Sequence, residues 1–155
     1  MKKLICLMLA LVLALSLVAC GAKAEPAAPT VDLAALYESY GQYLPEMFTM
    51  DENTMMDFLG IDVADCASFQ IAICSEGMRA DEVWLIQAKD ETALKNLREL
   101  ADTRITAKLD ETETYAPDQF VVVEKAQILE KGLYLALFIS PDVDAMVAEF
   151  EAAFK

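Results

Sequence analysis

The chain has 155 residues, 56% of them hydrophobic, and its 26 acidic and 12 basic residues give a net charge of −14. This length is typical of one domain, and the negative charge excludes nucleic-acid binding while it favours cationic partners or simple solubility. The chain has no histidine, which excludes triads built on imidazole and most zinc and copper sites.

The first 19 residues have the pattern of an export signal. Lys2 and Lys3 form a positive start, and residues 4–16 are almost continuously apolar. The apolar run, about 16 residues long, is shorter than the roughly 20 residues that a membrane-spanning helix needs. A cleaved signal peptide over residues 1–19 is therefore favoured over a permanent transmembrane helix.

The segment Leu17-Val18-Ala19-Cys20-Gly21 resembles the bacterial lipobox, with a branched apolar residue, a small residue and then cysteine. It predicts cleavage between Ala19 and Cys20 and transfer of a diacylglycerol to the Cys20 thiol. Two or three palmitate-like chains anchor firmly, because each buried CH₂ contributes about 0.8 kcal/mol. We expect a lipoprotein at the extracytoplasmic face of the cell membrane, with an unlipidated secreted protein as the alternative.

Residues 20–30 are predicted to form the lipidated N-terminus and a flexible tether. Pro26 and Pro29 lie among alanines, and this composition cannot build a core. Fully extended, residues 21–30 reach at most about 33–36 Å, so the domain would work close to the bilayer. Residues 31–155 are predicted to be a single domain. All 26 acids but only 10 bases lie after residue 19, so the exported part has a net charge of −16.

Two helices are expected at the start of the domain. Asp32 can cap the first, which runs up to Pro45 with an apolar stripe made of Leu33, Leu36, Tyr37, Tyr40 and Leu44. Asp51 can cap the second, and Gly60 is placed to end it in the left-handed conformation. The residues expected to face inward on the second helix are Met55, Phe58 and Leu59.

A β-hairpin and a long helix should follow. Residues 67–75 and 81–89 are rich in β-branched and aromatic side chains and flank a Ser-Glu-Gly-Met turn. Trp84 has apolar neighbours on both sides, which favours core packing over ligand stacking. Asp90 can cap a helix that extends to about Lys108 and covers the sheet. Its inward face consists of Leu94, Leu97, Ala101 and Ile105.

A second hairpin and a last helix complete the domain. Pro117 favours a short helix after a polar stretch, although residues 121–123 would also suit a strand. Residues 127–130 and 133–139 flank Lys131-Gly132, and the second of these strands is apolar enough to be central. The final helix starts at Ser140-Pro141-Asp142, and its stripe is Val143, Met146, Val147, Phe150 and Phe154.

These elements follow the order ααββα(α)ββα. They predict an α+β fold in which a single antiparallel sheet, built from two β-hairpins, packs against helices as a ββαββα core.

Two cysteines remain for a disulfide, because Cys6 leaves with the signal peptide and Cys20 is acylated. Cys66 and Cys74 are joined by a predicted strand that separates them by more than about 20 Å, whereas a disulfide needs Cα atoms within about 7 Å. We expect two free, buried thiols.

Carboxylates are the only abundant functional groups. They cluster at Asp51-Glu52, at Asp62 and Asp65, at Asp81-Glu82 and at Asp110-Glu111-Glu113. Such pairs can hydrolyse glycosides or bind calcium, but none matches a calcium loop and all lie at helix starts or turns, where acids are common. Arg79 is expected to form a rim ion pair with Asp81 or Glu82. Glycine-rich phosphate loops and Ser-x-x-Lys are absent, so no catalytic residue, metal or cofactor is assigned.

Four segments besides the lipobox resemble a family of short bacterial lipoproteins, from Gram-positive species, that carry the domain of unknown function numbered 4358. They are Leu59-Gly60-Ile61, residues 79–84, the strand end at Ala88-Lys89-Asp90, and residues 133–141. The resemblance spans nearly the whole chain. It implies an exported, membrane-tethered domain, and it brings no activity and no site residues.

The leading hypothesis is a membrane-anchored, non-enzymatic interaction or ligand-binding module. Besides the bilayer that holds acylated Cys20, its partner would be a protein, a peptide or a cationic envelope component, and not nucleic acid. The alternative is a cell-envelope hydrolase that uses a carboxylate pair, for which two acids from different segments must face one pocket. A structural or assembly lipoprotein is the third possibility.

Overall fold

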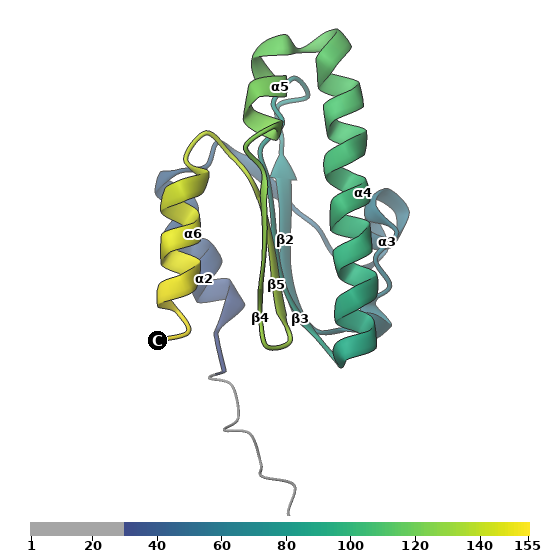
Figure 1. Cartoon of the computed structure of the whole chain (residues 1–155), viewed down its shortest axis with the longest axis vertical. Coiled ribbons are helices and arrows are strands. Elements are labelled where there is room, and N and C mark those ends of the chain that lie inside the picture. Colours follow the sequence, from purple (N-terminus) through teal and green to yellow (C-terminus); the bar gives the residue numbers. More distant parts are fainter. Residues whose placement is uncertain (1–29) are drawn as a thin grey trace, which may run out of the picture.

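The computed structural model describes residues 30–155 (Figure 1). The predicted signal peptide over residues 1–19, the acylation site at Cys20 and the tether up to residue 29 lie outside the described residues. Between residues 30 and 155, no helix combines the length and the apolar character needed to cross a bilayer.

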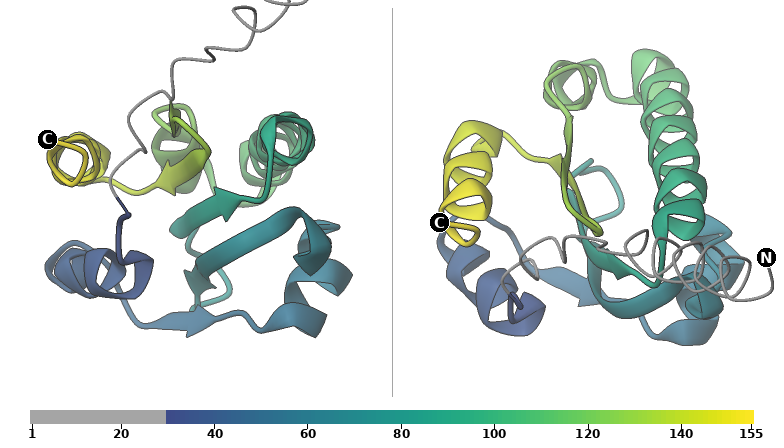
Figure 2. Two further views of the ribbon diagram at one scale, coloured as in Figure 1. Left: turned by 90° about the horizontal axis from the view of Figure 1, so that it is seen from below. Right: turned by 60° about the horizontal axis from the view of Figure 1, so that its bottom comes forward.

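The predicted α+β fold is confirmed: a five-stranded antiparallel sheet lies between two layers of helices (Figure 2). The strand order is β1-β2-β3-β5-β4. The strands are β1 (Met47–Thr49), β2 (Cys66–Cys74), β3 (Glu82–Ala88), β4 (Gln127–Lys131) and β5 (Tyr134–Ile139). Helices α2 (Leu33–Ser39) and α6 (Val143–Ala152) cover one face, and α3 (Glu52–Leu59) and α4 (Glu91–Tyr115) cover the other.

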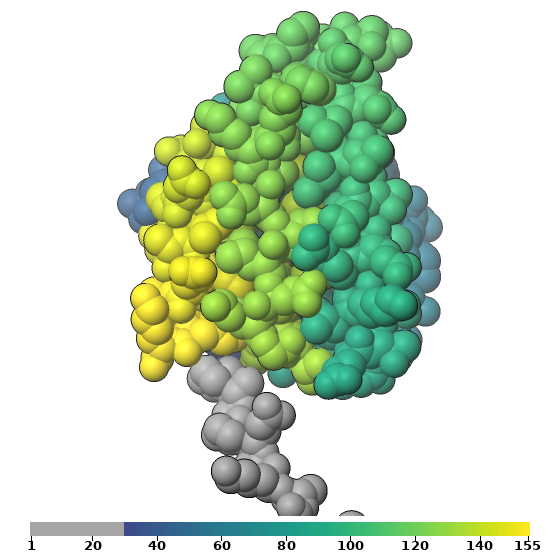
Figure 3. Space-filling view, viewed as in Figure 1, coloured from purple at the N-terminus to yellow at the C-terminus, as the bar shows by residue number. Residues whose placement is uncertain are grey.

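Both predicted hairpins are present, and they join through β3 and β5 in the middle of the sheet. Strand β5 is buried along its whole length, as its apolar sequence predicts. Edge strand β4 lies on the surface between α4 and α6 (Figure 3), where exposed Gln127, Glu130 and Lys131 discourage pairing with another chain.

Alternation along β3 divides the core in two, because successive side chains of a strand point to opposite faces. Trp84 and Ile86 pack on the α4 side with Leu97 of α4, whereas Val83 and Leu85 pack on the α2–α6 side. The burial of Trp84 confirms its predicted place in the core.

Three predicted N-caps are confirmed. The carboxylates of Asp32, Asp51 and Asp90 each accept a hydrogen bond from a backbone N–H of the first turn of α2, α3 and α4. Gly60 ends α3 in the left-handed conformation, with φ of 70°.

Several expectations about the first two helices are wrong. Helix α2 ends at Ser39 and continues as the 3-10 helix η1 (Tyr40–Gln42) rather than running to Pro45. Phe58 is 68% exposed, because Met55 and Leu59, four residues apart, already define the inward face of α3 and Phe58 lies one residue off it. Strand β1 was not expected, and it exists because Phe48 pairs with Ile73 of β2.

Helix α4 is longer than predicted. It continues through the polar stretch to Tyr115, because Ile105 and Leu109 still pack on the core and Thr112 is buried. Pro117 then starts α5 (Pro117–Val123), which confirms the helical alternative for that segment.

Cys66 and Cys74 are free thiols, as expected, and they lie at the two ends of β2. Both are half-buried rather than buried. Helix α5 packs mainly on α4 at the end of the domain opposite residue 30 (Figure 1), and its Val123 is buried in the core on the α4 face.

Candidate functional site

Glu82 is a fully buried carboxylate at the start of β3. It lies two residues before Trp84, so both side chains point to the α4 face of the sheet. Strand β3 places this carboxylate inside an otherwise apolar layer, where an isolated negative charge would be strongly unfavourable. Its partners therefore determine whether the site is stable.

Three side chains surround the Glu82 carboxylate and form with it the Glu82 cluster (Glu82, Trp84, Arg104 and Lys108). Arg104 Nε lies 3.0 Å from both carboxylate oxygens and Nη2 lies 2.8 Å from Oε2. Trp84 Nε1 donates to Oε1 over 2.7 Å. Lys108 Nζ is 3.5 Å from Oε2. Arg104 and Lys108 are four residues apart, so α4 presents both cations on one face.

A second buried carboxylate, Asp81, precedes Glu82. Arg79 Nε donates to its Oδ2 over 3.0 Å, while Oδ1 is buried without a hydrogen-bond partner among the described residues. The Arg79 prediction is right about Asp81 but wrong about the setting: the Asp81 side chain is fully buried, so the ion pair is not a rim contact.

A cavity of about 80 Å³, the turn cavity, lies beside the Glu82 cluster. It opens between the β2–β3 turn and the end of α4, and Lys108 belongs both to its lining and to the cluster. The lining residues are Gly77, Met78, Arg79, Ala80, Lys108, Glu111, Thr112, Tyr115 and Ala116.

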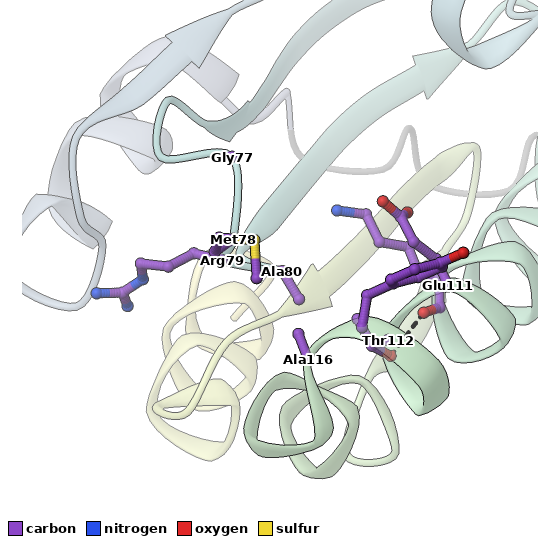
Figure 4. A pocket seen from close by; sticks show the side chains of 9 residues that line it. Gly77, Met78, Arg79, Ala80, Glu111, Thr112 and Ala116 are labelled. Atoms are coloured by element: carbon purple, nitrogen blue, oxygen red, sulfur yellow. Dashed lines mark hydrogen bonds between the residues drawn. The ribbon is translucent and has the colours of Figure 1, made fainter.

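Figure 4 shows how the turn cavity is walled. Met78 and Ala80 of the turn face Glu111, Thr112 and Ala116 of the α4–α5 corner, while the Arg79 side chain points away. The corner is tied to the turn, because Gln119 Oε1 of α5 accepts a hydrogen bond of 3.0 Å from the Ala80 N–H. The two walls are thus held at a defined separation.

Exposed apolar side chains flank the opening. Met78 is 67% exposed and Tyr115 is 76% exposed, and both line the same cavity, so they form one small exposed apolar patch. Glu111 is exposed beside them. The turn cavity therefore combines a largely buried lysine side chain with an apolar and acidic rim.

A second hollow of about 390 Å³ is lined by carboxylates of the predicted acidic clusters. Asp62 caps the 3-10 helix η2 (Val63–Asp65), and Asp65 pairs with Lys89 over 3.0 Å. The Lys89 ammonium holds the pKa of the Asp65 carboxyl below its usual value of 3.8. Glu99 of α4 lies in the same hollow.

The other predicted carboxylate clusters are not brought together. Asp51 forms a capping box with Thr54, whose backbone N–H lowers the pKa of Asp51 most. Residues 110–113 lie on α4, and of these acids Glu111 reaches the turn cavity. Among residues 30–155, no three of the His, Cys, Asp and Glu side chains are arranged to hold a metal ion.

Sequence reasoning placed Asp81 and Glu82 at the start of a strand beside a turn, where acids are common, and missed their burial and the Glu82 cluster. The sequence did contain a signal. In a strand, Glu82, Trp84 and Ile86 point to the same face, and the large apolar side chains of Trp84 and Ile86 indicate that this face is buried. On the predicted helix, Arg104 and Lys108 are four residues apart and lie on one face, where they could neutralise Glu82. No local sequence pattern indicated that this helix face packs on that strand.

A comparison with protein families gives one match: the model described as a domain of unknown function, DUF4358, matches residues 38–140. The matched range contains the sheet, the Glu82 cluster and the turn cavity, and it ends before α6. Neither the curated proteins nor the solved structures include a match to the chain.

Proposed function

Because the chain belongs to the DUF4358 family, whose description assigns no activity, we propose a function from its own residues: it is a lipid-anchored, non-enzymatic module that binds its ligand in the turn cavity. The anchor is acylated Cys20, and the module works on the outer face of the cytoplasmic membrane. Its partner is a protein or peptide of the cell envelope.

One observation carries the binding proposal: Lys108, a lining residue of the turn cavity, also belongs to the Glu82 cluster, which is already organised. Arg104, Trp84 and Glu82 hold one another through short hydrogen bonds, and Lys108 extends from that framework into the cavity lining. Binding sites of this kind gain affinity because little side-chain entropy is lost when the ligand arrives.

The position of the cavity also supports this proposal. The described chain starts at residue 30 at one end of the domain, and the α4–α5 corner lies at the opposite end (Figure 1). A lipid attached upstream of residue 30 would thus join the domain at the end opposite the turn cavity, so the attachment does not block the cavity.

Lipid attachment is tested by feeding an alkyne-labelled fatty acid to Gram-positive cells that express the full chain. We expect label on the wild type and on Cys66→Ser, and none on Cys20→Ser, because only Cys20 follows the lipobox. An inhibitor of the lipoprotein signal peptidase should leave residues 1–19 attached. Label that persists in Cys20→Ser would overturn the anchor.

Binding is tested by the melting temperature of the full lipidated chain in detergent, screened against envelope peptides, metabolites and divalent cations. A ligand that binds the native state raises the melting temperature, because it adds to the free energy of unfolding. The added free energy is about 2.7 kcal/mol when the ligand concentration is 100 times its dissociation constant. Ala116→Leu, which narrows the cavity, should remove the shift, and Ala35→Leu on exposed α2 is the control. A shift that survives Ala116→Leu contradicts the proposed location.

The rival function, a hydrolase with a carboxylate pair, rests on the hollow that Asp62, Asp65 and Glu99 share. Asp65 is a poor proton donor, since Lys89 lowers its pKa, so it could act only as a base or nucleophile. Release of soluble fragments from cell-wall glycan that is lost in Asp62→Asn would favour the hydrolase. The binding proposal predicts no release by either protein.

A further inference from the structure

We propose that the group bound in the turn cavity is a single carboxylate with an apolar side chain next to it, as at the C-terminus of a peptide. This rests on the proposed binding function and specifies its ligand. The carboxylate is recognised by the Lys108 ammonium, and the apolar side chain lies against Met78 and Tyr115.

The charge balance beneath the cavity motivates the choice of an anion. Glu82 carries one negative charge and is shared by two cations, Arg104 and Lys108. Asp81 is balanced by Arg79. These five side chains therefore hold one excess positive charge, with Arg79 and Arg104 partly exposed and the exposed Glu111 carboxylate at the rim, in a protein whose net charge is −14. A single anion in the cavity neutralises this excess.

Lys108 is the cation with unused capacity. Its side chain is only 12% exposed, and its distance of 3.5 Å from Glu82 Oε2 exceeds the roughly 2.7–3.2 Å of a hydrogen bond. Arg104, in contrast, occupies both Glu82 oxygens at 3.0 Å or less. An ammonium has three donors, and a nearly buried one is stabilised by each acceptor that it gains.

The walls add donors and apolar surface. Gly77 and Met78 line the cavity, and within residues 30–155 neither backbone N–H donates to a backbone acceptor. Backbone N–H groups of a turn are common partners of terminal carboxylates. A cavity needs about 10–15 Å³ per water, so about 80 Å³ admits a carboxylate, while the side chain beside it remains at the rim with Met78 and Tyr115.

The surrounding charge selects the rest of the ligand. Glu111 lies at the opening, Asp110 and Glu113 are exposed on the same part of α4, and an acidic surface repels polyanions such as nucleic acid or phosphate-rich polymers. A peptide that pairs one terminal carboxylate with basic side chains matches both the cavity and its rim.

The test measures binding to the full lipidated chain in detergent by calorimetry. The probe is the acetylated tetrapeptide Lys-Lys-Ala-Leu with a free carboxylate, compared with its C-terminal amide and with N-acetyl-leucine. We expect the free acid to bind at least tenfold tighter than the amide, because a charged hydrogen bond is lost. Weaker binding of N-acetyl-leucine identifies a peptide rather than a small carboxylate as the source.

Three variants locate the contact. Lys108→Met should weaken binding of the free acid about tenfold or more, whereas Lys108→Arg keeps the charge and should bind within a few-fold of wild type. Tyr115→Ala, at a position that is already exposed, should weaken binding without lowering the melting temperature. Lys131→Met, on edge strand β4, is the matched control and should leave affinity unchanged.

Equal binding of acid and amide, or full affinity in Lys108→Met, would overturn the carboxylate site and leave the wider binding proposal intact. The carboxylate site would also be overturned if none of the three probes bound. The wider binding proposal would fail only if no compound in the melting-temperature screen gave a shift that Ala116→Leu removes.

Discussion

The two faces of the sheet hold their helices by different means. On the α2–α6 face, aromatic rings form a continuous chain: Tyr40 packs on Phe138, Phe138 on Phe150, and Phe150 on Phe154, with centroid distances of 5.0–6.1 Å. On the α4 face, the Glu82 cluster is embedded in an apolar layer. The core of one face is apolar, with the hydrogen bonds from Ser39 and Tyr43 to Glu149 of α6 at its surface, whereas the other face carries a charge cluster inside its core.

This difference has a structural consequence. Apolar packing is not directional, so the core contacts of α6 set its alignment less strictly than an ion pair would, and the directional contacts of α6 are the surface hydrogen bonds to Glu149. The bidentate pair between Arg104 and Glu82 requires one alignment of α4 on β3, because other alignments leave a charge buried without its partner. The turn cavity borders the face whose geometry is constrained in this way. The α2–α6 face has its own polar exception, the buried Tyr40 hydroxyl, whose pKa is raised by burial.

The largest effect should come from Glu82→Ala. We expect a loss of about 3–5 kcal/mol in the free energy of unfolding, since Arg104 and Lys108 would remain buried without their counter-charge. Urea denaturation followed by far-ultraviolet circular dichroism measures this loss. Replacing the cluster with Glu82→Leu, Arg104→Met and Lys108→Met together should recover most of it. A loss below about 1 kcal/mol for Glu82→Ala would show that the faces do not differ in this way.

On the opposite face, Met146→Ala should cost about 2–5 kcal/mol, because it leaves a cavity among buried apolar side chains. Here shape should be sufficient: Met146→Leu should remain within about 1.5 kcal/mol of wild type. On the α4 face, by contrast, Glu82→Gln should be less stable than wild type although glutamine has nearly the same shape as glutamate, because it removes the negative charge. If Glu82→Gln is as stable as wild type, charge is not what distinguishes the two faces.

A smaller effect is expected at two glycines, one on each side of the sheet. Gly60→Ala should lose about 1 kcal/mol, because its φ of 70° is unfavourable for a side chain although the nearest atom, Leu100 Cδ2, is at an ordinary 3.8 Å. Gly41→Ala in η1 has open space and no positive φ, so it should be neutral or gain up to about 1 kcal/mol. Thermal unfolding of both variants checks the contrast.

The smallest effect concerns Cys66 at the α4 face. Burial, together with Asp65 and Asp62, raises the pKa of its thiol from 9.0 to about 11. The folded state thus holds this proton more tightly than the unfolded state, so the thiol's contribution to stability is present below pH 9 and is lost as pH rises toward 11. Alkylation by iodoacetamide, quantified by mass spectrometry, should accelerate steeply over that range. Rapid alkylation at pH 8 would contradict the raised pKa.

The elements that sequence predicted correctly depend on short-range chemistry. Asp32, Asp51 and Asp90 act as caps within three residues of their own position, and Gly60 ends its helix by its own backbone freedom. The nearly continuous apolar runs of β3 and β5 are likewise a local pattern. What failed involved partners distant in the chain: β1 needs Ile73, and the extra length of α4 needs the core beyond Lys108.

The candidate site depends on such distant partners throughout. Residues 79–84 are conspicuous in the sequence. Whether Glu82 can be buried as a carboxylate, however, depends on its ion pair with Arg104, which lies 22 residues further along. The turn cavity likewise needs Gln119 of α5 to hold the Ala80 N–H over a sequence separation of 39. No spacing rule relates these positions, because they meet only after β3 has paired and α4 has packed.

By itself, the sequence predicted the order of the elements apart from β1, the α+β class and the free state of Cys66 and Cys74, since periodicity, capping and chain length act locally. Only the tertiary structure decided that Asp81 and Glu82 are buried, that two cations share Glu82, and that Lys108 lines a cavity. The physical reason is that the environment of a charge depends on every segment packed around it, and burial is a property of the assembled layers.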